Sequence, residues 1–298
     1  MIITTRPCSG DSDLRRVTEL VQAFPNQQLH VADLPYRLAS WSLESDRNAR
    51  LWTDAAGKLL AFAIIQLPWQ ALDSFVHPAA RELGIETAIM IWAAERMQEL
   101  VAERGGPLRL YISVREDQLD DMMLLAQHGF ASADWRVLHL ALPLDDVIPE
   151  PELPPGFVLR PLDGQRELER SVRLHREAFG ANTMTIPWRR RVLQAPAYAP
   201  ELDVVVEAPD GELAAFCVCW LSPATGQGQV EPLGVHPAYR SLGLARAVLL
   251  EGLWRLQAHG AAEALVTAYE DDAGALRLYS SAGFRPAYRT VTYTRTFA

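Results

Sequence analysis

The chain has 298 residues, of which 49% are hydrophobic and 22% are charged, and its formal net charge is -9. This length exceeds the usual size of one domain, so we expect two domains of about 150 residues each. The acidic charge argues against a nucleic-acid partner, because phosphate binding needs clustered Lys and Arg. The sequence has neither an apolar stretch of about 18 residues nor a leader with a charged and then an apolar part, so we expect a cytoplasmic protein without a membrane partner.

An internal repeat begins near the N-terminus. Arg6-Pro7 recurs as Arg160-Pro161, and the nine residues from Val76 to Gly84 match Val235 to Gly243 at seven of nine positions. Two copies of one fold are the simplest explanation.

Five prolines lie between Pro143 and Gly156, where the two copies join. Proline fixes φ and cannot continue a helix, so this stretch predicts an extended linker with the boundary near Pro149. We therefore predict one domain over residues 1–148 and a second over residues 149–298.

The second copy shows the secondary structure most clearly. Strands are predicted at residues 157–160, 203–208, 212–221, 229–235, 264–268 and 290–296, and helices at residues 165–179, 244–259 and 273–282. Asp210-Gly211 separates two β-rich runs and indicates a hairpin. Hairpin strands with interspersed helices predict an α/β fold with a mixed sheet.

Two features of this copy favour structural interpretations. The run Arg189–Arg191 follows Trp188, and we interpret it as the solvated face of a helix. Cys217 and Cys219 alternate along a predicted strand, so we interpret them as buried thiols and expect no metal site.

A possible phosphate-binding loop follows the strand that ends at Val235. It reads Arg240, Ser241, Leu242, Gly243, Leu244, Ala245 and runs into a predicted helix. Unpaired N–H groups at a helix N-terminus attract anions, and small residues at 243 and 245 let a diphosphate approach the backbone. Taken alone, such a loop is equally typical of a plain structural turn.

The surrounding motifs resemble the GNAT (general N-acetyltransferase) superfamily. They comprise the loop, its entry from Val235 to Arg240, and Leu278-Tyr279 followed by Gly283-Phe284. The resemblance covers residues 156–298 and, more weakly, residues 1–142. It implies two tandem GNAT-like acyl-CoA N-acyltransferase domains that use acetyl-CoA as cosubstrate. The cofactor-binding candidates that it implies are Leu233, Gly234, Val235, Arg240, Ser241, Leu242, Gly243, Leu244, Ala245 and Asp272.

Asp272 stands where family members often carry Asn. An ionised Asp caps a helix and accepts a hydrogen bond but donates none. Its contact with the pantetheine arm of CoA therefore differs from the family pattern.

Acyl transfer needs a neutral amine, a polarised carbonyl and a proton for the departing thiolate. Tyr279 matches the family position whose phenol protonates the sulfur; the alternative is a Tyr packed under the cofactor. Glu231 lies four residues before Val235 and is a candidate base, directly or through water; the alternative is a carboxylate that attracts a cationic substrate. His236 recurs at His77, so we favour a turn-capping role for it.

We expect the first helix of the second copy and the loop that follows it to form the wall of the acceptor pocket. The candidate wall residues are His175, Glu177, Trp188 and Tyr198, which are equally compatible with core and surface positions.

The first copy has lost two of these features. Glu86 stands in place of Ala245, where it would repel a diphosphate, and Leu125 stands in place of Tyr279. We predict that residues 1–148 form a degenerate, non-catalytic domain that serves packing or shapes the acceptor site. The alternative is that both copies bind CoA weakly.

The resulting hypothesis is an N-acetyltransferase that acts on the primary amine of a small molecule, as a monomer or homodimer. The acidic composition hints at a cationic acceptor. One alternative is a non-catalytic acyl-CoA sensor or scaffold. Another is an acetyltransferase similar to mycothiol synthase.

Overall fold

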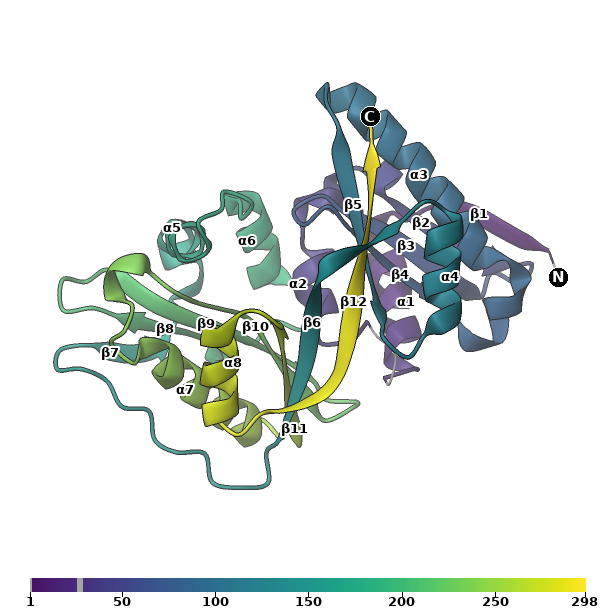
Figure 1. Cartoon of the computed structure of the whole chain (residues 1–298). Coiled ribbons are helices and arrows are strands. Elements are labelled where there is room, and N and C mark those ends of the chain that lie inside the picture. The colour runs from purple at the N-terminus through teal and green to yellow at the C-terminus, as the bar shows by residue number, and fades with distance from the viewer. Residues whose placement is uncertain (1, 26–28) are drawn as a thin grey trace. The chain divides into compact units, whose positions relative to one another are not determined.

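The computed structural model describes residues 2–25 and 29–298 (Figure 1). The chain forms two compact units that interleave along the sequence. The first comprises the residues up to Val31, Ser40–Val137 and Tyr288–Ala298; the second comprises Ala32–Ala39 and Leu138–Ala287. In the described part of the chain, no helix has both the length and the apolar character that a membrane span requires.

The sheet of the first unit has the strand order β1-β2-β3-β4-β5-β12. Its strands are β1 (Ile3–Pro7), β2 (Ala49–Asp54), β3 (Leu59–Gln66), β4 (Ala71–Val76), β5 (Leu108–Arg115) and the C-terminal part of β12 (Arg285–Phe297). Its α-helices are α1 (Gly10–Gln22), α3 (Ile85–Arg104) and α4 (Leu119–Gln127), and its 3-10 helices are η1 (Trp41–Glu44), η2 (Asp46–Asn48) and η3 (Pro78–Leu83).

The sheet of the second unit has the strand order β6-β11-β10-β9-β8-β7. Its strands are the end of β6 (Ala131–Pro143), β7 (Val158–Pro161), β8 (Asp203–Glu207), β9 (Leu213–Ser222), β10 (Gln227–Val235) and β11 (Glu263–Tyr269). Its α-helices are α2 (Leu34–Leu38), α5 (Leu168–Phe179), α6 (Ile186–Gln194), α7 (Leu244–Ala258) and α8 (Ala273–Ser281), and its 3-10 helices are η4 (Gly164–Glu167), η5 (Pro200–Leu202) and η6 (Pro237–Tyr239). Because β10 is parallel to β11 and antiparallel to β9, the predicted mixed sheet is confirmed.

The last strand of the sequence joins the first unit. Residues Thr290 to Phe297 of β12 pair antiparallel with Arg115 to Leu108 of β5. The compact units therefore do not coincide with the contiguous copies, although the assignment of residues 1–148 as non-catalytic and 149–298 as catalytic remains a prediction.

The repeat is visible in the first ion pair of each unit. Arg6 donates two hydrogen bonds to Asp13, at 2.5 and 2.6 Å, and Arg160 donates two to Glu167, at 2.7 and 2.8 Å. In each unit the Arg lies on the first strand and its partner lies seven residues later, at the start of the first helical segment. Bidentate pairs of this kind are among the stronger polar contacts in proteins, and they fix the helix against the strand.

Helices α5 and α7 pack on opposite faces of β9. A side chain on Gly252 of α7 would lie 2.8 Å from the sulfur of Cys219 and 2.9 Å from that of Cys217, so glycine lets α7 lie close to the strand. Phe216 points to the opposite face, since successive side chains alternate along a strand. Figure 1 shows α7 along the strands β8, β9 and β10.

Two structural interpretations from the sequence have different outcomes. Cys217 and Cys219 are buried free thiols, as predicted. The interpretation of Arg189–Arg191 as a solvated helix face is wrong for Arg189, which is buried and pairs with the buried Asp203. A hydrophobicity pattern cannot reveal this pairing, because the carboxylate that makes burial of the Arg favourable lies on β8.

Candidate functional site

The strands β10 and β11 separate in the middle of the second sheet. They pair in parallel only from Gln227 with Glu263 to Gln229 with Leu265. On the other edge of β10, the pairing with β9 is interrupted between Val230 and Leu233 by a bulge. A bulge bends a strand locally. The edge of β10 beyond Gln229 is not paired with β11.

The loop after β10 leads into the N-terminus of α7. Ser241 and Gly243 both have positive φ, of 66° and 82°, and Gly243 is the residue before the helix. Among the described residues, the N–H groups of residues 241–245 make no hydrogen bond. A side chain on Gly243 would meet no atom within 4 Å. Exposed N–H groups and open space at the positive end of a 15-residue helix make a site for an anion.

Gly234 has a different role from Gly243. A side chain at this position would lie 2.6 Å from the Phe216 ring and 2.9 Å from the methyl group of Ala178 in α5. The glycine therefore keeps the end of α5 against β10. Arg240 adds a second link to the same end, because its guanidinium donates to the carbonyl of Ala178 at 3.1 Å.

His236 caps the turn after β10, as predicted. Its Nδ1 accepts a hydrogen bond from the N–H of Ala238 at 3.1 Å, and His77 makes the equivalent bond to Ala79, also at 3.1 Å. The Nε2 of His236 lies 3.1 Å from a carboxylate oxygen of Glu177. The Nδ1 contact is therefore the same in both units, whereas Nε2 of His236 faces a carboxylate and Nε2 of His77 lies 3.5 Å from the ammonium nitrogen of Lys58.

Tyr279 lies on α8 and is 8% exposed. Burial raises the pKa of its phenol, and the carboxylates of Glu231 and Asp272 raise it further. The phenol therefore stays protonated at neutral pH and can donate a proton. Asp272 caps α8, since its Oδ1 accepts from the N–H groups of Gly274 and Ala275 at 3.0 and 2.9 Å.

Glu231 lies in the bulge of β10 and is partly buried. Burial raises the pKa of its carboxyl to about 7, the carboxylate of Asp33 raises it as well, and Arg37 opposes both. The indole of Trp220 donates to the backbone carbonyl of Glu231 at 2.7 Å and holds the bulge in place. A carboxyl that titrates near neutral pH is suited to accept and release a proton.

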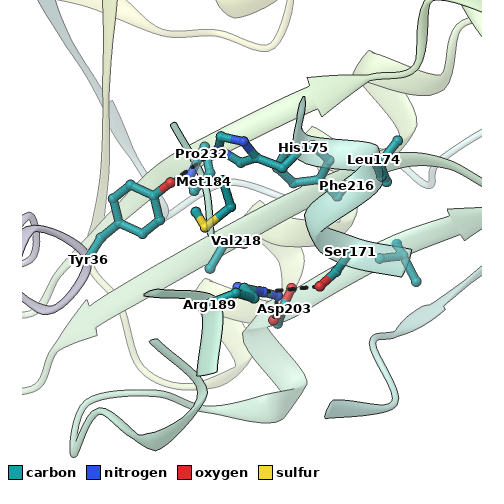
Figure 2. A pocket seen from close by; sticks show the side chains of 11 residues that line it. Tyr36, Ser171, Leu174, His175, Met184, Arg189, Asp203, Phe216, Val218 and Pro232 are labelled. Atoms are coloured by element: carbon teal, nitrogen blue, oxygen red, sulfur yellow. Dashed lines mark hydrogen bonds and ion pairs between the residues drawn. The ribbon is translucent and has the colours of Figure 1, made fainter. Parts of the chain in front are cut away.

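A small cavity lies between α2, α5, α6 and the strands β8 and β9 (Figure 2). Its volume is about 20 Å³. Among the candidate wall residues, His175 lines this cavity, and its Nε2 lies 3.2 Å from the hydroxyl of Tyr36. Burial lowers the pKa of His175 to about 4, so the ring is neutral at pH 7.

Of the other wall candidates, Trp188 and Tyr198 contact residues that line this cavity, whereas Glu177 lies beside His236. Trp188 is buried, and its ring lies 5.2 Å from that of Tyr36. The hydroxyl of Tyr198 donates to Asp203 at 2.8 Å. The sequence provided no signal for Tyr36, because 139 residues separate it from His175.

The corresponding loop of the first unit has two carboxylates near its Arg81, those of Glu86 and Asp121. Arg81 lies 3.8 Å from Asp121 on α4, and burial raises the pKa values of both Asp121 and Glu86. The strand β4 pairs with β3 from Ala71 to Val76 without a bulge. The first unit thus has the fold of the second but not its irregular strand, and its loop is less favourable for an anion.

Comparisons with known proteins agree with this geometry. The model of the acetyltransferase (GNAT) family matches residues 169–284. A mycothiol acetyltransferase of Kineococcus radiotolerans is 32% identical to this chain, and the match covers 74% of this chain and 71% of that protein. A mycothiol acetyltransferase of Frankia alni is also 32% identical, and the match covers 75% of this chain and 71% of that protein. A GCN5-related N-acetyltransferase of Sphaerobacter thermophilus has a similar fold, with a TM-score of 0.71 and 22% identity; the match covers 99% of this chain and 95% of that protein. A tandem GNAT protein from the clavulanic acid biosynthesis pathway also has a similar fold, with a TM-score of 0.69 and 16% identity; the match covers 99% of this chain and 98% of that protein.

Proposed function

Because this chain belongs to the GNAT family and is an acyl-CoA-dependent N-acetyltransferase, we propose that its second unit transfers the acetyl group of acetyl-CoA to the primary amine of a small molecule. The observation that carries this proposal is the end of the β10–β11 pairing at Gln229, after which β10 leads through the loop to the open N-terminus of α7. Glu231 lies on this unpaired part of β10, and its negative charge acts on the phenol of Tyr279.

The cosubstrate would bind along the loop from Arg240 to Ala245 and the unpaired edge of β10. The N–H groups at the start of α7 suit its diphosphate, and the backbone of Leu233, Gly234 and Val235 suits its pantetheine arm. Asp272 already accepts two N–H groups of its own helix, so we assign it to positioning α8 rather than to a strong contact with the cosubstrate. This assignment requires no metal, because backbone N–H groups polarise the thioester carbonyl.

Glu231 and Tyr279 divide the proton transfers between them. The carboxylate of Glu231 takes a proton from the acceptor's ammonium group, directly or through water, and the neutral amine forms the new C–N bond. As the C–S bond breaks, the phenol of Tyr279 gives its proton to the thiolate, and the second proton that the nitrogen loses on becoming an amide restores the phenol. The products are the amide and CoA with its thiol protonated, and one proton is released to solvent in total.

The first unit takes no part in the chemistry in this proposal. Glu86 stands at the start of α3 where the second unit has Ala245, and Leu125 is buried at the position of Tyr279. Without a small residue at the helix start and without a phenol, the first unit lacks both the diphosphate site and the acid.

The relatives suggest one specific acceptor. Proteins named mycothiol acetyltransferase cover about three quarters of this chain at up to 32% identity in the longer matches. The unacetylated precursor of mycothiol therefore belongs in any set of acceptors that is tested, together with a polyamine and an aminoglycoside.

The test is thiol release from acetyl-CoA in the presence of spermidine, kanamycin and unacetylated mycothiol, with the acetylated product identified by mass spectrometry. The proposal predicts amine-dependent release of CoA and a product heavier by one acetyl group. CoA binding without turnover of any amine would instead support an acyl-CoA sensor.

A further inference from the structure

The segment Ala32–Ala39 belongs to the second unit, although it lies early in the sequence. The indole of Trp188 donates to the carbonyl of Tyr36 at 3.3 Å, and the guanidinium of Arg191 donates to the carbonyl of Ala39 at 2.8 Å. The helix within this segment has five residues, too few to be stable by itself. Contacts with the second unit therefore set its position.

Asp33 is the acidic residue of this segment. Its Oδ1 accepts a hydrogen bond from the side-chain amide of Gln229, which is buried and lies two residues before Glu231 on β10. The negative charge of the Asp33 carboxylate also disfavours ionisation of Glu231. Geometry and electrostatics thus place the two carboxylates beside the same bulge of β10.

Among the described residues, the charged and titratable groups that interact electrostatically with Glu231 include Asp33, Tyr36 and Arg37 on the segment and Tyr279 on α8. Both phenols have raised pKa values and are neutral at pH 7, so Arg37 is the only cation in this set. Two carboxylates in one partly buried place repel each other, and a bound cation relieves that repulsion.

We propose that Asp33 and Glu231 together bind the ammonium group of the acceptor, with Asp33 holding the cation while Glu231 takes its proton. This inference rests on the proposed function, because it assigns a second carboxylate to the same acceptor site. One N–H bond of the ammonium group breaks, the proton passes to Glu231, and the nitrogen becomes the neutral nucleophile. Asp33 stays ionised throughout and acts as a substrate-binding residue.

The experiment compares Asp33→Asn, Asp33→Glu and wild type in the full chain. The control is Glu150→Gln, which removes one carboxylate from an exposed position of the second unit. Steady-state rates are measured with whichever of spermidine, kanamycin and unacetylated mycothiol the wild type acetylates fastest, as a function of pH. The pKa of Glu231 is measured separately by a carbon-13 NMR titration of its carboxyl group.

Asp33→Asn is expected to raise the KM for the amine at least tenfold while the KM for acetyl-CoA changes less than twofold. It also moves the acidic limb of kcat/KM and the NMR titration of Glu231 to lower pH, because one negative charge has gone. Asp33→Glu restores most of the affinity for the amine. A purely structural Asp33 would change the unfolding midpoint without these shifts.

Two results overturn the inference. The first is an Asp33→Asn variant that acetylates the amine with the same KM and pH profile as Glu150→Gln. The second is an unchanged NMR titration of Glu231 in Asp33→Asn. If the wild type acetylates none of the three amines, the proposed function fails, and the NMR titration alone then decides whether the two carboxylates are coupled.

Discussion

The hydroxyl of Tyr36 lies 3.2 Å from Nε2 of His175, although 139 residues separate the two in the sequence. The ring of His175 is also packed against Phe179 and Phe216, with centroid distances of 4.8 and 5.8 Å. This apolar environment excludes water and disfavours the imidazolium form. The folded state therefore favours the neutral form of His175.

The pH dependence of stability follows from this preference for the neutral ring. The pKa of His175 is about 4 in the folded protein, against 6.5 in the unfolded chain, so the unfolded state binds more protons between these values. Wild type should lose stability relative to His175→Phe as the pH falls from about 6.5 to about 4. Urea unfolding at several pH values measures this, with the exposed His259→Phe as control. A difference in stability between wild type and His175→Phe that does not change with pH would contradict the lowered pKa of His175.

Arg189 and Asp203 form a buried ion pair in the second unit. Removing one partner leaves the other charge buried without compensation, so Arg189→Ala should destabilise the protein by about 3–5 kcal/mol. Arg190→Ala, one residue along the same helix and exposed, is the matched control and should change the free energy of unfolding by less than about 0.5 kcal/mol. Equal effects of the two variants would show that the pair contributes nothing.

Tyr279→Phe should lower kcat by about 10²-fold or more, because general acid catalysis contributes roughly this factor. The KM for acetyl-CoA should stay within about twofold, since the ring and its contact with Phe284 remain. Tyr269→Phe, at an exposed tyrosine at the end of β11, is the control. An undiminished kcat in Tyr279→Phe removes the acid role and leaves a tyrosine that only packs under the cosubstrate.

We expect the pKa of Glu231 to determine how kcat/KM falls toward acidic pH. A base with a pKa of about 7 is protonated below that pH, so kcat/KM should fall as the pH drops through 7. Glu231→Gln should be slow at every pH and should lack this limb. The measurement is initial rate against pH at saturating acetyl-CoA. A Glu231→Gln variant that keeps both the rate and the limb would leave Glu231 as a carboxylate that only attracts the substrate.

The fold could be predicted largely from the sequence because the repeat and the hydrophobic periodicity are local signals. The strand predicted at 229–235 and the helix at 244–259 appear as β10 (Gln227–Val235) and α7 (Leu244–Ala258). Their connecting loop has the left-handed Gly243 that a turn into a helix favours.

The parts of the site that could not be predicted depend on contacts between distant segments. Asp33 and Tyr36 reach the second unit through a five-residue helix that has no long periodic pattern of its own. The burial of Arg189 depends on Asp203, which lies on another element. The place of the last strand in the first unit could not be predicted either, because the pattern of residues 290–296 predicts a strand but not the strand with which it pairs.

The loops of the two units are expected to differ in their affinity for CoA. Ala245→Glu copies the first unit's Glu86 into the second unit and places a carboxylate where the diphosphate would lie. It should weaken acetyl-CoA binding by at least about tenfold. Glu86→Gln removes the corresponding carboxyl from the first unit and is the control, with no expected effect on binding at the second.

Calorimetric titration of the full chain with acetyl-CoA tests the central claim of a single site in the second unit most directly. One molecule should bind per chain in the wild type, and binding should be lost in Ala245→Glu. Two molecules per chain, or undiminished binding in Ala245→Glu, would contradict it.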